Sequence, residues 1–377
     1  MEKTNRNLAI DAYRGFVMLL MMAEVLELLR VSRALPGNAF WAFLAFNQTH
    51  VSWAGCSLHD TIQPGFSFLV GVALPYSIAA RMARGGTFRQ MFPHALWRGL
   101  LLAALGIFLR STDKAQTYFT FEDTLTQIGL GYPLLFLLAY LRPKWQWTAL
   151  GAILFGYWLA WALYPPTLPG AYTGFLAHWN KGNNFGNAFD VWFLNLFPRV
   201  KPFVQNDGGY LTLSFIPTLG TMILGLAAGQ WMRAATAPAI LMRRLIAAGG
   251  AGIAAGLLLH FAGICPIVKR IWTPSWTLFS GGLCFLFLAA FYWATEVKRW
   301  RRWAFPLIVV GTNSIAAYVI AHFGERFFLD TLRIHLGAHF FAFLGAPYEP
   351  LLRGLVVLSL YWLVLWWMYR RKIFLKI

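Results

Sequence analysis

Long apolar segments, separated by short basic clusters, follow one another along this chain. Ten of them come close to the roughly 20 mostly apolar residues that a helix needs to cross a bilayer. The sequence therefore predicts an all-α, polytopic transmembrane helix bundle of about ten spans, forming a single domain over residues 1–377. The expected spans are about 9–30, 57–80, 93–110, 124–141, 146–164, 211–232, 245–264, 275–295, 304–323 and 351–369.

Composition supports this pattern and excludes other classes of protein. Apolar residues make up 58% and charged residues 12% of the 377 residues, against roughly 45–50% and about 25% in soluble domains. A soluble enzyme and a disordered chain are thereby excluded. The three cysteines have neither paired nor metal-binding spacing, so we expect them to pack between helices.

Lysine and arginine predict the orientation. Ten spans place both termini and four connections on one side, and these hold 18 Lys and Arg residues, among them Lys3, Arg6 and Lys376. The opposite connections and their borders hold 11, although they are longer. Because positive residues collect on the cytoplasmic side, both termini are predicted to be cytoplasmic. The net charge of +18 thus reflects topology, and no nucleic-acid partner is expected.

The first segment is expected to remain as a signal anchor, because Asp11 and Arg14 interrupt its start and no small-residue cleavage site follows Leu29. The non-cytoplasmic connection at about 165–210 is unusually long, and loops beyond about 12–15 residues are often functional. It is rich in aromatic residues and poor in charge. We therefore expect it to fold over the outer mouth of the bundle.

Ionisable residues at membrane depth mark candidate functional sites. Asp11 and Arg14 share one face of the first helix near its cytoplasmic end. Glu24 and Glu27 lie toward the outer end, about 20 Å further along at a rise of 1.5 Å per residue. Asp11 and Arg14 could simply pair at the interface, and Glu27 could simply reach water.

The segment 47–64 places His50, His59 and Asp60 at the outer mouth of the second helix. A neutral imidazole titrates near the working pH and can take a proton from an attacking amine or hydroxyl. A lone histidine is more often a packing residue, so spacing alone does not decide the role of His50. Asp60 could orient an imidazole or could cap the second helix.

Four motifs, in one order along residues 9–323, make the chain resemble a known family. It is similar to the transmembrane acyltransferases related to heparan-α-glucosaminide N-acetyltransferase. The motifs are Ile10-Asp11-Ala12-Tyr13-Arg14-Gly15, His50-x-x-Trp53-x-Gly55 with Asp60 and Pro64, Pro266-Ile267-Val268-Lys269-Arg270-Ile271-Trp272-Thr273-Pro274-Ser275, and Gly311-Thr312-Asn313-Ser314-Ile315 with Tyr318.

The resemblance implies that an acyl group, most simply acetyl, passes from cytosolic acetyl-CoA to an amino sugar across the membrane. It makes His50 the catalytic residue, and the topology independently places His50 on the non-cytoplasmic side. His50 could act as a general base or could carry the acyl group transiently.

Two departures from the family concern polar residues. An asparagine common in the first helix of the family aligns with Val25, and we expect the neighbouring Glu24 to position His50 or to receive its proton. A family arginine aligns with Gln127. The missing cation argues against simply copying an acidic heparan acceptor.

The phosphates of acyl-CoA need cations at the cytoplasmic face, and its pantetheine arm needs a narrow channel. Arg81, Arg84 and Arg89 are expected to be ordinary positive-inside residues. No phosphate-binding glycine loop is found, so ATP or NAD chemistry is not expected. The residues assigned to the donor are Asp11, Arg14, Arg98, Asn313 and Ser314.

Tryptophans, a lysine and polar residues near the outer mouth could hold a sugar by stacking and hydrogen bonding, although tryptophan also anchors helices at the interface. His335 and His339 lack a third ligand, so no metal site is expected. The residues assigned to the acceptor are Trp53, Trp179, Asn180, Lys269, Trp272, Thr273 and His322.

The sequence is thus interpreted as a bacterial inner-membrane N- or O-acyltransferase whose partners are lipid, acyl-CoA and a periplasmic sugar or glycan acceptor. A homodimer is left open. The alternative is a proton-coupled transporter in which Asp11, Glu24 and His50 form a proton path. Binding of CoA thioesters would distinguish the two.

Overall fold

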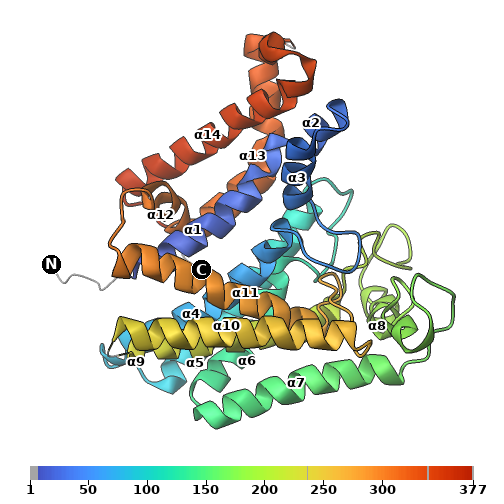
Figure 1. Ribbon diagram of the computed structural model, residues 1–377, viewed down its shortest axis with the longest axis vertical. Helices are drawn as coiled ribbons and strands as arrows, with labels where there is room; N and C mark the ends of the chain where they lie inside the picture. Colours follow the sequence, from blue (N-terminus) through green and yellow to red (C-terminus); the bar gives the residue numbers. More distant parts are fainter. Residues whose placement is uncertain (1–6, 236, 338, 376–377) are drawn as a thin grey trace. The chain divides into compact units, whose positions relative to one another are not determined.

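The computed structural model describes residues 7–235, 237–337 and 339–375, and within these ranges the chain is helical (Figure 1). The described part contains no strand, only one isolated bridge between Ala54 and Val268. The chain forms two compact units. Unit 1 comprises residues 7–52, 56–62 and 290–375, and unit 2 comprises 53–55 and 63–289. Lys3, Arg6 and Lys376, which entered the orientation argument, lie outside the described residues.

Unit 1 is built on packing of α1 against α12 and α13, with α14 packed on α13, α12 and η1. Its elements are α1 (Leu8–Met22), η1 (Ala23–Leu26), α2 (Leu28–Ala34), α3 (Ala39–Gln48), η2 (His59–Thr61), η5 (Trp293–Val297), α12 (Phe305–Gly311), α13 (Ser314–Leu336), η6 (Phe340–Leu344), η7 (Ala346–Tyr348) and α14 (Glu349–Arg370).

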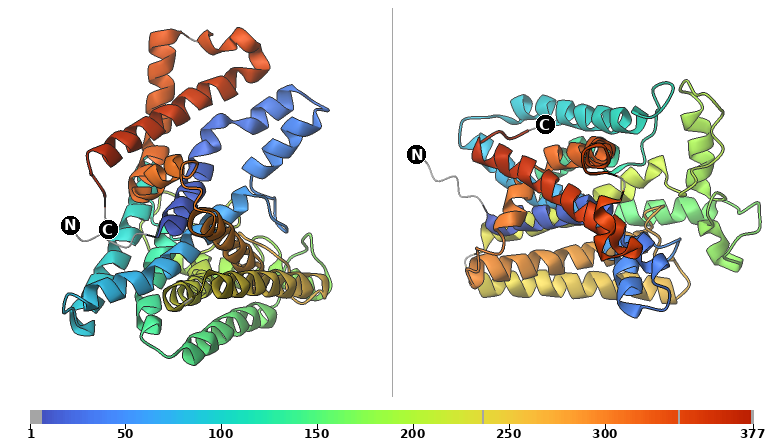
Figure 2. Two further views of the ribbon diagram at one scale, coloured as in Figure 1. Left: turned by 60° about the vertical axis from the view of Figure 1, so that its left-hand side comes forward. Right: turned by 90° about the horizontal axis from the view of Figure 1, so that it is seen from above.

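Unit 2 is a bundle of long helices with a folded loop region at one end. In it α6 packs on α5 and α9, and α10 runs beside α11 (Figure 2). Its elements are α4 (Ile62–Met82), α5 (Phe88–Ser111), α6 (Thr124–Ala139), α7 (Pro143–Leu163), η3 (Gly174–Trp179), α8 (Phe185–Leu194), η4 (Thr212–Ser214), α9 (Phe215–Ala234), α10 (Pro238–Phe261) and α11 (Pro274–Tyr292), whose last residues belong to unit 1.

Six of the described helices are long and apolar enough to cross a bilayer, or seven if the bent pair α12–α13 counts as one span. These findings describe a multi-pass membrane protein, while ten spans and cytoplasmic termini stay predictions. The predicted fourth span, α6, has only 16 residues. The fifth, α7, has 21 residues, but its lysine, glutamine and four tryptophans lower its mean hydropathy.

Two predicted spans are broken, which corrects the expectation of continuous helices over 9–30 and 304–323. The first helix ends at Met22, and Glu27 takes a left-handed conformation with φ of 47° before α2 begins. The Gln48 side chain compensates for the break, because it donates to the carbonyl of Ala23 and accepts from the amide of Leu28 at 2.9 Å. The second break lies between α12 and α13, which meet at 82°.

Close backbone contact joins α1 to α12. A Cβ atom added to Gly15 would overlap the carbonyl of Leu307, and one added to Gly311 would overlap the carbonyl of Asp11. The two helices therefore cross at a distance that only glycine allows at these positions. This crossing fixes the N-terminal part of the first helix, and with it Asp11 and Arg14, within unit 1.

Candidate functional site

A histidine and an aspartate form a close pair at the loop between α3 and η2. The Nδ1 atom of His50 lies 2.8 Å from Oδ1 of Asp60. The Asp60 side chain is almost fully buried at 1% exposure, whereas that of His50 is 35% exposed. The carboxylate is thus inside the loop, and the imidazole reaches its surface.

The second oxygen of Asp60 fixes the loop that carries His50. Oδ2 accepts hydrogen bonds from the amide of Val51 at 3.2 Å and from the amide and hydroxyl of Ser57, both at 3.0 Å. A carboxylate with three donors on one oxygen is held as an acceptor, so Nδ1 of a neutral His50 carries the hydrogen toward Oδ1. The lone pair of the ring then sits on Nε2, the atom that can take a proton.

A second acid–histidine pair lies beside the first. Nε2 of His59 is 2.9 Å from Oε1 of Glu24, and the His59 side chain is 5% exposed. The rings of His59 and His50 lie 4.6 Å apart, centre to centre, at 51° to each other. Glu24, with 57% exposure, connects this cluster to the surface of unit 1. We call Glu24, His50, His59 and Asp60 the histidine cluster.

The break in the first helix positions the cluster. Gln48, which bridges the two sides of the break, stands two residues before His50, while Glu24 lies in the 3-10 turn that starts the break. One side chain therefore ties the segment of Glu24 to the segment of His50. Asn47 adds a further hold through a 3.2 Å hydrogen bond from the amide of Leu58.

His322 of α13 approaches the same cluster. Its ring stacks on Tyr318 at 4.4 Å, and its Nδ1 lies 3.0 Å from the carbonyl of Tyr318. His322 is close enough to act electrostatically on Glu24, as are His50 and His59. Of the assigned residues of unit 1, the structure brings together His50, Asp60, Glu24 and His322.

The residues assigned to the donor in unit 1 lie along other parts of α1 and α13. Asp11 is buried, and its Oδ1 lies 3.5 Å from a guanidinium nitrogen of Arg14. Asn313 stands at the break before Ser314 and is 1% exposed. Its amide donates to the carbonyl of Ile373 at 2.9 Å and accepts from the amide of Leu375 at 3.0 Å. Asn313 thus connects the break to the segment that follows α14. A contact between Asn313 and acyl-CoA stays a prediction.

Arg98 lines a small recess in unit 2 where α4, α5 and α6 meet. Its guanidinium lies 4.6 Å above the ring of Tyr132 and donates to the tyrosine hydroxyl at 3.1 Å. Arg81 and His94 line the same recess. Sequence reasoning assigned neither of them to the site, and their charges become visible as a group only once the helices pack.

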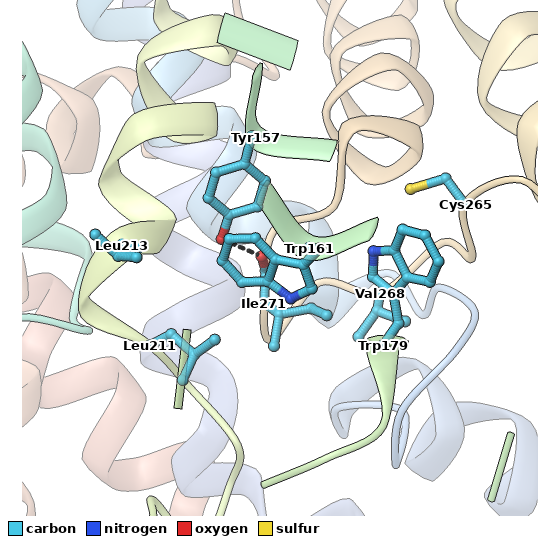
Figure 3. Packing of buried hydrophobic residues seen from close by; sticks show 8 residues of the cluster. All are labelled: Tyr157, Trp161, Trp179, Leu211, Leu213, Cys265, Val268 and Ile271. Atoms are coloured by element: carbon cyan, nitrogen blue, oxygen red, sulfur yellow. Dashed lines mark hydrogen bonds between the residues drawn. The ribbon is translucent and has the colours of Figure 1, made fainter. Parts of the chain in front are cut away.

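The loop region of unit 2 contains an aromatic cluster, drawn in Figure 3. Trp161 and Trp179 are each 1% exposed, and the rings of Tyr157 and Trp161 lie 4.0 Å apart. The Tyr157 hydroxyl donates to the carbonyl of Ile271 at 2.8 Å. We call this group the aromatic plug, with members Tyr157, Trp161, Trp179, Leu211, Leu213, Cys265, Val268 and Ile271.

Buried acids and a buried thiol accompany the plug. Thr212 donates its amide to Asp190 at 3.0 Å, yet burial raises the pKa of Asp190 to about 6. Burial likewise raises the pKa of Glu122 to about 7, although Arg110 works against this, and that of the Cys265 thiol to about 11. The thiol is therefore neutral at ordinary pH and unsuited to nucleophilic attack.

The residues of unit 2 that were expected to bind the sugar acceptor mostly make contacts within the fold. Trp53 donates its indole nitrogen to the carbonyl of Trp179 at 3.0 Å, and Asn180 bonds both backbone groups of Tyr172. Thr273 is buried and bonds the carbonyl of Pro266 at 2.7 Å.

The remaining two assigned residues of this loop are also buried. Trp272, with φ of 47°, is 1% exposed, and its indole lies 3.3 Å from the Thr221 hydroxyl. Lys269 is 4% exposed. These contacts account for the residue types of the motif around 266–275, and sugar binding by them stays a prediction.

The sequence analysis did not assign His59, a member of the histidine cluster, or Ser57, which donates two hydrogen bonds to Asp60. The signal was present, because both stand in the segment that carries His50 and Asp60. The partner of His59, however, is 35 residues away in the first helix and depends on the break there. Among the described residues, no three histidine, cysteine, aspartate or glutamate side chains gather as metal ligands.

Comparison with known proteins relates the chain to one group of enzymes. No protein-family model matches it. It is 23% identical to heparan-alpha-glucosaminide N-acetyltransferase of Homo sapiens, over 98% of this chain and 59% of the human protein. It is 22% identical to the enzyme of the same name from Mus musculus, over all of this chain and 61% of the mouse protein. The chain thus spans about three fifths of the length of these relatives.

Proposed function

We propose that this protein is a membrane acetyltransferase that moves an acetyl group from acyl-CoA on the cytosolic side to a sugar amine or hydroxyl on the periplasmic side of a bacterial inner membrane. The relation to a glucosaminide N-acetyltransferase supports an acetyltransferase in general. The observation that carries the assignment to particular residues is the contact between Nδ1 of His50 and the buried Asp60 carboxylate.

His50 would act as the base of the reaction. Its Nε2 takes the proton from the acceptor nitrogen or oxygen while the new bond to the acyl carbon forms and the C–S bond of the thioester breaks. The same imidazolium then gives this proton to the leaving thiolate. Asp60 stabilises the imidazolium and holds the ring in the tautomer with its lone pair on Nε2.

A second mode uses the same atom as a nucleophile. Nε2 attacks the thioester carbon, thiolate leaves, and the acyl group rests on His50 until the acceptor takes it. Labelling with radioactive acetyl-CoA in the absence of acceptor separates the modes. A label that is bound by the parent protein and lost in His50→Ala supports the covalent mode, and an unlabelled parent supports direct transfer.

Glu24 and His59 would support His50 during this proton transfer. The Glu24–His59 pair lies against the His50 ring, and Glu24 is the exposed end of the cluster. We infer that the pair positions the His50 ring. An amine that arrives as ammonium loses two protons, and because the thiolate takes only one of them, the pair offers the other a way to solvent. Glu24 would then supply the polar side chain that the family has as an asparagine at the position of Val25.

Cations on the cytoplasmic side would hold the phosphates of the donor. Arg98, Arg81 and His94 line one recess of unit 2, and Arg14 stands near the predicted cytoplasmic end of α1. Phosphate groups prefer such clustered guanidinium donors. Keeping the phosphates at this face avoids moving them through hydrocarbon, which would be very costly. A bound CoA thioester supplies an activated acyl carbon.

The first test is thermal unfolding of the purified protein with acetyl-CoA and with CoA, followed by release of free thiol when glucosamine is added. Saturating ligand at 100 times its Kd stabilises the folded state by about 2.7 kcal/mol. We expect the parent to be stabilised and to release thiol, and His50→Ala to keep the stabilisation while losing the release. His335→Ala, which replaces an exposed histidine, should behave as the parent.

Absence of both stabilisation and thiol release would overturn the proposal. In that case, proton-coupled solute uptake that depends on Asp11, Glu24 and His50 would establish a transporter instead.

A further inference from the structure

Unit 1 contains a second polar site close to the histidine cluster. It is a cavity of about 450 Å³ between η1, α2, α13, η6 and α14, a volume within the range of small-molecule sites. Its apolar lining consists of Leu329 and the buried Phe341. Carboxylates and guanidinium groups supply the rest, which is the combination that recognises a charged sugar: an apolar surface for the ring and charges for its substituents.

Most of these charges hold the walls together. A guanidinium nitrogen of Arg353 lies 3.1 Å from Oε2 of Glu27 and another lies 3.8 Å from Glu349. Arg30 lies 3.2 Å from Glu27. Glu27 thus joins α2 to α14, and the pairs explain why the left-handed residue at the break is a glutamate.

Two charged residues of the lining do not form such ion pairs. Within the described part of the chain, neither Arg333 nor Glu325 takes part in an ion pair, although both line the cavity. Arg30 and Arg353 act electrostatically on Glu325, as do Glu24 and Glu27. The cavity therefore offers one guanidinium and one carboxylate to a solute.

Two chain segments connect the cavity lining to the histidine cluster. Glu27 follows Glu24 by three residues, and Glu325 follows His322 by three residues on α13, about one helical turn. Glu24 and Glu325 interact electrostatically. Two residues of the cavity lining, Glu27 and Glu325, thus stand three positions from Glu24 and from His322, the residues near His50.

We propose that this cavity is the recognition site of the acceptor, and that the acceptor is an amino sugar that also carries an anionic group. Glu325 attracts the ammonium form of the amine, Arg333 binds the anionic substituent, and Phe341 contacts the apolar face of the ring. This inference rests on the proposed function, because only acetyl transfer makes the bound solute an acceptor. The binding of the solute itself does not depend on it.

The test measures binding and transfer separately. Glucosamine 6-phosphate carries both charges, glucosamine lacks the anion, and N-acetylglucosamine 6-phosphate lacks the amine charge. Their dissociation constants are measured by isothermal titration with the parent and with Arg333→Gln, Glu325→Gln and Arg326→Gln. Arg326 is the control, because it lies on α13 with 88% of its side chain exposed and does not line the cavity, although its ion-pair partner Asp330 does.

We expect the parent to bind glucosamine 6-phosphate about tenfold more tightly than either partial analogue, as for one charge-assisted hydrogen bond. Arg333→Gln should abolish the preference over glucosamine, and Glu325→Gln the preference over the N-acetylated sugar. Arg326→Gln should leave both. In thiol-release assays Arg333→Gln and Glu325→Gln should raise the KM for glucosamine 6-phosphate about tenfold with kcat nearly unchanged, and Arg326→Gln should change neither.

Equal affinity of the parent for all three sugars would overturn the proposal. An equal loss of affinity for glucosamine 6-phosphate in all three variants would also overturn it. Binding with these preferences but without thiol release would uphold the site and count against acetyl transfer. Thiol release with glucosamine that is indifferent to Arg333 and Glu325 would uphold the transfer and reject the site.

Discussion

The histidine cluster of unit 1 and the aromatic plug of unit 2 both contain residues that the sequence singles out, but they differ in how far these side chains reach the surface. In the cluster, the buried Asp60 holds an imidazole that is 35% exposed, so polar contacts lead outward from the fold. In the plug, Trp161 and Trp179 are each 1% exposed, and their side chains are enclosed by their neighbours. Conspicuous residues in a motif therefore indicate chemistry only where the fold leaves them accessible.

The difference has an energetic side. Removing a member of the plug opens a cavity in close packing, which costs stability. Removing a member of the cluster at the surface costs little packing, and its main effect is expected on the reaction. Each comparison below therefore measures activity per folded molecule together with the free energy of unfolding.

Asp60→Asn should produce the largest effect. The amide and hydroxyl donors of Val51 and Ser57 require an acceptor on one side of residue 60. The oxygen of an asparagine therefore faces them, and its NH2 group donates to Nδ1 of His50, which pushes the ring to the wrong tautomer. We expect thiol release to fall by roughly 10³-fold, as when the acid of a histidine–aspartate pair is neutralised, with acetyl-CoA stabilisation retained. A loss smaller than about tenfold would show that Asp60 only holds the loop.

Trp161→Ala should have the largest effect on stability. Loss of a buried tryptophan costs about 3–5 kcal/mol, so the Tm should fall sharply while activity per folded molecule stays near that of the parent. Trp192→Ala is the control, since Trp192 is 61% exposed, and it should change the free energy of unfolding by less than about 0.5 kcal/mol. A loss of activity comparable to that of Asp60→Asn would give the plug a direct part in the reaction.

Glu24→Gln should reduce kcat by about tenfold, because His59 loses its charged partner and no longer holds the His50 ring in place. Glu296→Gln, which removes a carboxylate that pairs with Arg301 at 3.6 Å in the same unit, should leave kcat unchanged. Full activity of Glu24→Gln alongside an inactive His50→Ala would contradict the supporting role of Glu24.

Glu122→Gln should have the smallest effect, confined to the pH dependence of stability. Burial raises the pKa of Glu122 to about 7 in the folded protein, against an ordinary value of 4.5. Folding therefore favours the protonated form, and stability falls as pH rises from about 4.5 to about 7. The variant should remove this fall, which is measured as a loss of a few degrees of pH dependence in Tm. Asp113→Asn, at an exposed position of the same connection, should keep the pH dependence of the parent.

Much of the fold could be predicted from the sequence, because length and apolar character alone suffice for helices such as α9 and α10. The break at Glu27 could not, since its left-handed backbone is stabilised by Arg353 and its open hydrogen bonds are taken up by Gln48. Both partners come from other segments, and the local sequence continues to favour a helix.

The candidate site divides in the same way. His50 and Asp60 lie ten residues apart, so their proximity follows from one short loop. The pairing of His59 with Glu24 depends on a helix break 35 residues upstream, and the burial of Trp272 depends on packing against Thr221 of α9. Tertiary contacts of this kind cannot be read from spacing.

The clasp between Asn313 and the segment after α14 sets an order of events during biosynthesis. The partners of the Asn313 side chain, Ile373 and Leu375, lie 60 and 62 residues later in the chain. While the ribosome is still adding α14, this amide at the break between α12 and α13 lacks both of them. This end of unit 1 can therefore close only when translation has passed Leu375, and a nascent chain that stalls earlier exposes an unsatisfied polar group to cellular quality control.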